Sequence, residues 1–366
     1  MSVAGPELTV SPIRELERRD LAEVARLHAD AGEGYVERLL AFFERTLLDH
    51  PWADDEIPSL VYEEGGEIVG FLGSNVRRMR FDGRAIRMAC SAHLLAHPRV
   101  RNKAVGALLL RRFLSGPQDL TITDGANETV RRMWEGLGGQ TVHVSCLTFV
   151  RVLRPFALAA HRALERLGIP AAERALTPLA RMLDSAATRV LDRGRADEAE
   201  SEQLTPSVLL VHLPQVTSGL RLVPDYDADY LTWLFEELER VGVERVFPDR
   251  IPRGGLVAEL VTRDREVIGW YVCHLRPHGL CRVLQVAARP RSVGAILDRL
   301  ALRAAELYAA GIYGRLEPRL VGPLSERPTH LRFSKGRLLV HGRDSEVVES
   351  ILRGEALLTR LDGEWW

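Results

Sequence analysis

A short uncharged stretch, residues 88–96 (MACSAHLLA), leads into the segment HPRVRNKAVG at residues 97–106, and the apolar run ALLL follows at once. The first stretch predicts a strand and the apolar run predicts a helix, so the segment between them is a tight turn that opens a helix. Backbone N–H groups at the start of a helix lack partners and carry partial positive charge. Together with the three basic side chains of the turn, they suit an anion, most naturally a phosphate.

The bulk composition limits the class of protein. The chain has 366 residues, of which 46% are hydrophobic and 27% charged, which is typical of a soluble globular protein with two domains. A net charge of −1 leaves no general basic field for nucleic acid or for an anionic membrane. We therefore expect no nucleic-acid and no membrane partner.

The cysteines and the apolar segments indicate the compartment. None of the four cysteines has CxxC spacing, and each lies in or beside an apolar run, which favours free thiols in a reducing compartment. The N-terminus has no basic segment followed by an apolar stretch, and the longest apolar candidate, residues 142–164, contains three arginines. A cytoplasmic protein is expected.

Hydrophobic periodicity and turn residues predict the order of elements in the first half as β-α-α-β-β-β-α-β-α-β, which is an α+β unit with a mixed sheet. The expected strands are residues 8–13, 59–64, 67–81, 85–96, 120–123 and 141–153, and the expected helices are residues 19–29, 35–48, 107–115 and 127–136. Residues 155–193 are expected to be mostly helical, and residues 196–203 form an acidic joint.

The second half repeats the first loosely. Residues 67–71 (EIVGF) match residues 266–270 (EVIGW), and each segment follows a strand and a polar turn. A second strand–turn–helix segment appears at residues 281–310, with the strand at residues 281–287 and the helix at residues 295–310. Two copies of one structural unit account for this pattern.

Two motifs in the first half resemble those of a known family. The pattern P-x-x-R-x-x-A-x-G at residues 98–106 resembles the acyl-CoA motif of GNAT-type N-acetyltransferases. The pattern N-x-x-V-x-x-x-W-E-x-x-G at residues 127–138 is similar to the next element of that family, in which an Asn opens a helix that carries a Tyr. The predicted strand order is also that of the family. The resemblance covers residues 8–153 well and the second half in outline.

This resemblance implies two tandem GNAT-like domains, each a mixed, mostly antiparallel sheet flanked by helices. The domains are expected at residues 1–153, which would bind acyl-CoA, and at residues 207–366, with a helical linker at residues 154–206. The turn of the second unit, residues 289–294 (RPRSVG), is too short to repeat the geometry of the first. We therefore expect the second unit to have lost the cofactor.

The resemblance also implies acetyl-CoA as acyl donor. The residues that it assigns to the donor are Leu94, Leu95, Ala96, Arg101, Asn102, Lys103, Ala104, Val105, Gly106, Ala107 and Asn127. Ala104 stands where the family usually has Gly; if this position has a positive φ, Ala costs about 1 kcal/mol. Asn127 is also a favourable helix N-cap.

The catalytic groups depart from the family pattern. Trp134 occupies the position of the family's acidic Tyr, and Ile122 replaces the Glu that some members use as a base. His93 and Asp124 are the remaining candidates for proton transfer, although a hydrogen-bonded or surface histidine is the more common case for a residue such as His93. His93 and His97 lie about 13 Å apart along a strand, so no metal site is expected.

The expected function is transfer of an acyl group from acyl-CoA to a small amine or amino sugar by direct attack. Two alternatives stay open. A Fem-type aminoacyltransferase also pairs two such units, but the intact phosphate turn and the lack of a basic stripe argue against it. A non-catalytic acyl-CoA-binding or scaffold protein is favoured by Trp134 and Ile122.

Overall fold

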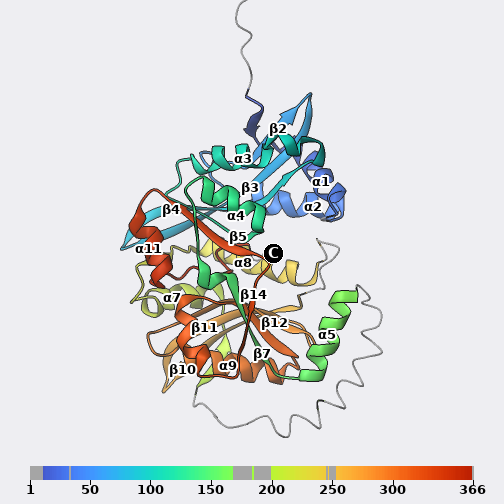
Figure 1. Cartoon of the computed structure of the whole chain (residues 1–366). Helices are drawn as coiled ribbons and strands as arrows, with labels where there is room; N and C mark the ends of the chain where they lie inside the picture. The colour runs from blue at the N-terminus through green and yellow to red at the C-terminus, as the bar shows by residue number, and fades with distance from the viewer. Residues whose placement is uncertain are drawn as a thin grey trace, which may run out of the picture.

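The computed structural model describes residues 11–32, 34–167, 184, 199–244, 246 and 253–364. The strands in this part of the chain form two mixed sheets, one in the upper and one in the lower half of Figure 1, and helices flank both. This architecture confirms the expected α+β class. No helix in the described ranges is both long and apolar enough to cross a membrane.

The first sheet has the order β1-β2-β3-β4-β5-β15-β6, and β9 pairs with β3 beside this path. Its strands are β1 (Ile13–Glu15), β2 (Leu60–Glu64), β3 (Glu67–Phe81), β4 (Arg84–Ala96), β5 (Leu120–Ala126), β6 (Gln140–Thr141), β9 (Leu222–Pro224) and β15 (Arg337–Gly342). Its helices are α1 (Leu21–Asp30), α2 (Val36–Phe43, continued as a π-helix over Glu44–Leu48), α3 (Val105–Leu114), α4 (Glu128–Gly136) and α11 (Ser345–Arg353).

The second sheet has the order β14-β7-β13-β12-β11-β10-β8. Its strands are β7 (Leu147–Val152), β8 (Glu200–Gln203), β10 (Gly255–Arg263), β11 (Glu266–Leu275), β12 (Leu280–Ala288), β13 (Gly311–Arg315) and β14 (His330–Phe333). The helices in this half are α5 (Pro155–Leu167), α7 (Pro206–Val216), α8 (Ala228–Val243), α9 (Val293–Glu306) and α10 (Val321–Ser325).

The repeated EIVGF and EVIGW segments become β3 and β11, and their glycines have a packing role. A Cβ on Gly70 would lie 2.5 Å from Val105, because α3 packs closely on β3. A Cβ on Gly269, which has a φ of 153°, would lie 2.2 Å from the carbonyl oxygen of Ala287 on β12. The motif therefore marks a close approach to the strand in each unit.

Strands are exchanged between the two halves of the chain. The strand expected at residues 141–153 is divided, and its second part, β7, pairs with β13 and β14 of the second sheet. In return β15 pairs with β5 and β6 of the first sheet, and β9 pairs with β3. Period-2 patterning predicts a strand but not its partner, so the sequence gives no sign of this exchange.

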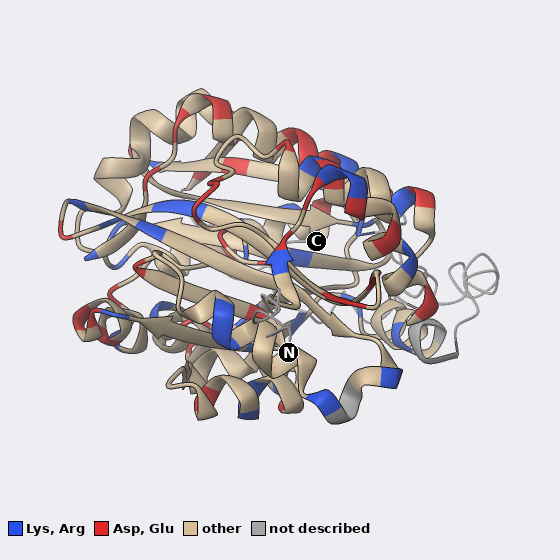
Figure 2. Ribbon diagram, turned by 90° about the horizontal axis from the view of Figure 1, so that it is seen from above, with Lys and Arg blue, Asp and Glu red and all other residues tan. Residues whose placement is uncertain are grey.

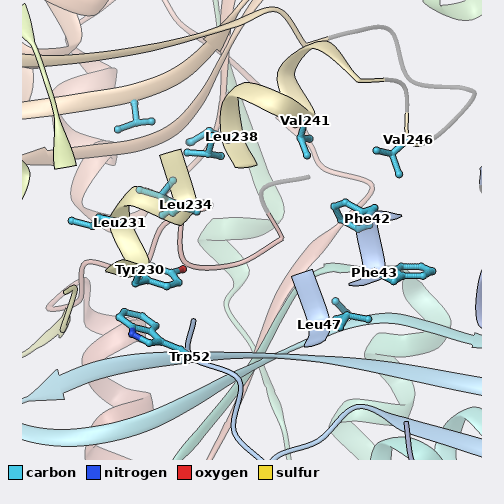
Figure 3. Close-up of a cluster of buried hydrophobic side chains, with 14 of the residues drawn as sticks. Phe42, Phe43, Leu47, Trp52, Tyr230, Leu231, Leu234, Leu238, Val241 and Val246 are labelled. Atoms are coloured by element: carbon cyan, nitrogen blue, oxygen red, sulfur yellow. The ribbon is translucent and has the colours of Figure 1, made fainter. Parts of the chain in front are cut away.

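A continuous apolar core joins the two halves (Figure 3). Phe42 and Phe43 of α2 lie in the same cluster as Leu234 and Leu238 of α8, and all four are fully buried. Within this cluster the indole of Trp52 stacks on the ring of Tyr230, with centroids 3.5 Å apart and an interplanar angle of 6°. The two units therefore share buried surface as parts of one body.

Three predicted segments lie near the N-terminus and between the two halves of the chain. Residues 8–10 of the strand expected at residues 8–13 lie outside the described part, and β1 begins only at Ile13. The expected helical segment is present as α5 to Leu167, and residues 168–193 lie outside the described part except Asp184. The expected acidic joint contains β8, which pairs with β10.

Because strands are exchanged between the two halves, a substitution in β15 should change the stability of the whole molecule. Leu339 of β15 is fully buried in the first unit's core, so Leu339→Ala should lower the free energy of unfolding by about 2–5 kcal/mol. Because the units share a core, calorimetry should show one transition that moves as a whole. Leu331→Ala on β14, where the side chain is exposed, is the control and should have little effect. Two transitions of which only one shifts would contradict the shared core.

Candidate active site

The central strands of the first sheet, β4 and β5, run parallel and separate after a short paired region. The paired residues are Met88, Ala89 and Cys90 on β4 with Leu120, Thr121 and Ile122 on β5. Although β4 continues to Ala96, no described strand pairs with it on this side beyond Cys90. The backbone edge of residues 91–96, which includes Leu94, Leu95 and Ala96, is therefore open to an extended ligand.

A β-bulge lies where β4 leaves β5. His93 and Leu94 together oppose one residue of β3, and His93 has a φ of 55°. Such bulges re-aim the backbone beside functional sites. The His93 ring packs among aromatic rings of α1 and α2, with centroids 5.1 Å from Phe43 and 5.7 Å from His28. The imidazole thus belongs to an aromatic cluster on the α1–α2 side of the sheet.

The turn after β4 is a 3-10 helix over Pro98–Lys103, followed by α3. Ala104 lies between them in the left-handed region, with φ 54° and ψ 30°, so the cost anticipated for a positive φ applies in this chain. The first-turn N–H groups of Val105, Gly106 and Ala107 have no acceptor within the helix. A Cβ on Gly106 would have only Met133 near it, at 3.9 Å, so this helix start is sterically open.

The basic side chains of the turn are held by the β2–β3 hairpin. Lys103 Nζ lies 2.5 Å from Glu64 Oε1, and Arg99 is paired with Glu67. The hydrogen bond from Arg99 lowers the pKa of the Glu67 carboxyl. All four side chains are exposed, so a phosphate at the helix start would compete with the two carboxylates for these cations. The side chains of residues 101 and 102 lie outside the described part.

The helix that follows β5 begins at Asn127, whose Oδ1 accepts a hydrogen bond from Val130 N at 3.0 Å. Asn127 is therefore an N-cap, and its contact with a cofactor stays a prediction. Trp134 on this helix is fully buried and donates from Nε1 to the carbonyl oxygen of Val340. A Cβ on Gly139 would lie 1.8 Å from its ring. Trp134 is thus a core residue.

The carboxyl group of Asp124 on β5 is held in place by two arginines and by a backbone N–H group. Its side chain is fully buried, and its Oδ2 lies 3.1 Å from Arg315 and 3.7 Å from Arg360. Its Oδ1 accepts a hydrogen bond from the backbone N–H of Glu364 at 3.0 Å. Asp124 and His93, the two catalytic candidates from the sequence, therefore belong to different clusters.

Glu364 is a functional candidate that the sequence reasoning missed. Its Oε1 accepts hydrogen bonds from Thr123 Oγ1 at 2.8 Å, from Gly125 N at 3.1 Å and from Asp124 N at 3.3 Å. The carboxylate thus covers the backbone of β5 just beyond its last pair with β4. More than two hundred residues separate the partners, and no local motif signals their contact.

The environment of Glu364 changes its protonation. Burial is the main cause that raises its pKa to about 7, and the negative charge of Asp124 adds to the effect. Part of the residue's surface stays open to solvent. Burial, followed by the charges of Glu364 and Asp124, also raises the pKa of the Cys90 thiol. Because Cys90 is the last β4 residue paired with β5, Glu364 lies near the point where the strands diverge.

A second carboxylate holds the tail that carries Glu364. Asp362 Oδ2 accepts hydrogen bonds from the N–H and hydroxyl of Thr359, at 3.0 and 2.8 Å, and Tyr226 donates to Oδ1 at 2.5 Å. Gly363 is required by close packing, because a Cβ there would lie 2.6 Å from Asp124 Oδ2. The tail is therefore held on both sides of the site. Within the described ranges, no group of three or more His, Cys, Asp or Glu could hold a metal ion.

The corresponding turn of the second unit differs from the first. A Cβ on Gly294, near the start of α9, would lie 2.6 Å from Arg327 Nη2. Asp298 holds this guanidinium through Nε at 2.9 Å and Nη2 at 2.6 Å. The Arg327 guanidinium thus occupies the space at the start of α9. The corresponding space at Gly106, at the start of α3, is open.

Comparisons with solved structures identify the fold. A GCN5-related N-acetyltransferase from Kribbella flavida aligns with a TM-score of 0.51 and 16% identity, over 91% of this chain and 71% of that chain. One from Anabaena variabilis aligns with a TM-score of 0.54 and 10% identity, over 91% and 73%. A probable N-acyltransferase from Enterococcus faecalis gives 0.54 and 8%, over 90% and 72%. No family model and no curated protein matches the sequence. The chain has a GNAT-type fold.

The left-handed Ala104 generates a testable prediction. Ala104→Gly should raise the free energy of unfolding by about 1 kcal/mol, because Gly adopts a positive φ without strain. Ala107→Gly, three residues later inside α3, is the matched control and should lower it by about 1 kcal/mol. Urea titration of the two variants measures both changes. Equal destabilisation by both substitutions would show that Ala104 is unstrained.

Proposed function

We propose that this protein is an acyl-CoA-dependent N-acyltransferase whose active site lies between β4 and β5 of the first unit. The acyl donor would be acetyl-CoA, and the acceptor a small amine or an amino sugar. The GNAT-type fold supports this class of reaction. All four cysteines are free thiols, which supports a cytoplasmic location.

The observation that carries the proposal is the open edge of β4 beside an open helix start. Residues 91–96 have a backbone edge that no described strand covers, and the first turn of α3 follows after a single turn of chain. An extended pantetheine arm can pair with the strand edge while the pyrophosphate accepts hydrogen bonds from the amides of Val105, Gly106 and Ala107. The bound donor would then extend from the β-bulge at His93 and Leu94 to the start of α3.

The chemistry requires stabilisation of the thioester oxygen and removal of a proton. An N–H group on the open edge of β4, near the bulge, would donate to the carbonyl oxygen as it becomes negative. The amine nitrogen bonds to the carbonyl carbon, the carbon–sulfur bond breaks, and the proton lost by nitrogen ends on the thiol or in solvent. Since thiolate is a tolerable leaving group, the missing tyrosine does not prevent this direct attack.

Glu364 would be the general base of this reaction. A carboxyl group whose pKa is about 7 is partly deprotonated at neutral pH and is a stronger base than an ordinary glutamate. Asp124 is a positioning residue in this scheme, because it binds the backbone of Glu364 and contributes to its raised pKa. Arg315 and Arg360 balance the charge of Asp124.

A negative charge introduced at the start of α3 tests whether the acyl donor binds there. Gly106→Glu places a carboxylate where the pyrophosphate would lie, and the open surroundings allow the side chain to fit. Calorimetric titration should show micromolar binding of acetyl-CoA to the wild type and at least a hundredfold weaker binding to the variant. Gly136→Glu is the matched control, since this exposed glycine of α4 also has free space around its Cβ. Absence of binding to the wild type would overturn the proposal.

The pH dependence of kcat/KM tests whether Glu364 is the general base. For Glu364→Gln we expect kcat/KM to fall about a hundredfold and to lose the rise with an apparent pKa near 7 that the wild type should show. A thiol-release assay with a panel of amines measures both. Binding of acetyl-CoA with no turnover of any amine would favour the non-catalytic alternative.

The stability of the same variant separates catalysis from structure. Because the folded-state pKa of Glu364 is raised above its unfolded value, the wild type should lose stability relative to Glu364→Gln as the pH rises from about 4.5 to about 7. The variant should then be at least as stable as the wild type at pH 8. A variant that is less stable at pH 8 would show that Glu364 serves the fold through its charge.

A further inference from the structure

A cavity of about 630 Å³ opens at the start of α9 in the second unit, away from the site between β4 and β5. Its wall comes from the end of β10, the first turn of α9 and the segment that contains α10. The charged residues that line it are Arg263, Arg291, Arg319 and Arg327, with Asp298 and Glu326. Basic and acidic residues are intermixed along much of the chain (Figure 2), whereas four arginines and two carboxylates give this lining an excess of positive charge.

Two of the arginines are held rigidly. Arg327 is bound by Asp298 through two hydrogen bonds and donates to the carbonyl oxygen of Pro323 at 2.6 Å. Arg319 is 10% exposed and donates from Nη2 to Glu317 and to the carbonyl oxygen of Val286. Preorganised guanidinium groups of this kind suit a phosphate, because little side-chain freedom is lost when it binds.

Two of the arginines that line the cavity have donors that the protein does not satisfy. Arg319 Nε is buried and has no hydrogen-bond acceptor in the described part of the chain. Arg291 is exposed, and no ion pair joins it to another described residue. A buried N–H without an acceptor is costly, and the N-terminus of α9 adds partial positive charge to a wall that already holds Arg327. An anion in the cavity would accept hydrogen bonds from Arg291 and would be favoured by the positive charge of the helix start and of the other arginines in the lining.

We propose that this cavity binds the phosphate group of a small organic molecule. The site is separate from the donor site proposed for the first unit, and it does not depend on that proposal. The ligand could be a free phosphorylated compound or the pyrophosphate end of a second molecule of coenzyme A. Both sources share the chemistry that the arginines recognise.

The test uses the full chain and pyrophosphate as the probe. Arg291→Asn removes one charge from the cavity rim, and Asn tolerates the left-handed φ of 68° at this position. Arg265→Asn is the matched control, because Arg265 is an exposed arginine with a φ of 64° in the neighbouring β10–β11 turn and does not line the cavity. Calorimetric titration should show a binding event that Arg291→Asn weakens at least fivefold and Arg265→Asn leaves unchanged.

Two further titrations locate the event and identify its source. Gly106→Glu should leave the Arg291-dependent event intact, since that substitution lies in the first unit. A second, Arg291-dependent site for coenzyme A would identify the cofactor as the ligand, whereas a single Arg291-independent site would indicate a free phosphorylated compound. The proposal is overturned if pyrophosphate does not bind, or if the two Asn substitutions weaken its binding equally.

Discussion

Each sheet of this molecule is completed by a strand from the other half of the chain. Without β15, the edge of β5 in the first sheet would be exposed, and without β7 the second sheet would lose the strand between β13 and β14. Uncovered strand edges are unfavourable because their backbone groups lack partners. The exchange, together with the core shared by α2 and α8, therefore holds the geometry of the site between β4 and β5.

The divergence of β4 and β5 leaves two unlike edges. On β5, the carboxylate of Glu364 accepts hydrogen bonds from the backbone of Asp124 and Gly125. On β4, residues 91–96 keep a backbone edge that no described strand covers. One edge is thus occupied by a group that can exchange a proton, and the other is free to hold an extended ligand. This asymmetry distinguishes the gap from an ordinary separation of strands.

The part of the site formed by local sequence could be predicted. Residues 97–106 carry turn and helix signals within ten residues, and the structure shows the expected strand, turn and helix. Even the consequence of Ala104 followed from backbone sterics once φ was known. The position of Glu364 could not be predicted, because its contact with β5 depends on tertiary folding. The partners of β7 and β15 were hidden for the same reason, since alternating hydrophobicity says nothing about which strand lies next to which.

The exchange of strands also sets an order of events during synthesis. The ribosome releases the chain from the N-terminus, so α3, β5 and α4 emerge long before residues 337–342 are made. Until β15 arrives, β5 presents an unpaired edge, and the first unit cannot reach its final form. The nascent first half is then the species most exposed to association with other chains. Folding of the proposed acyl-transfer site is therefore a late event, although most of its residues are translated early.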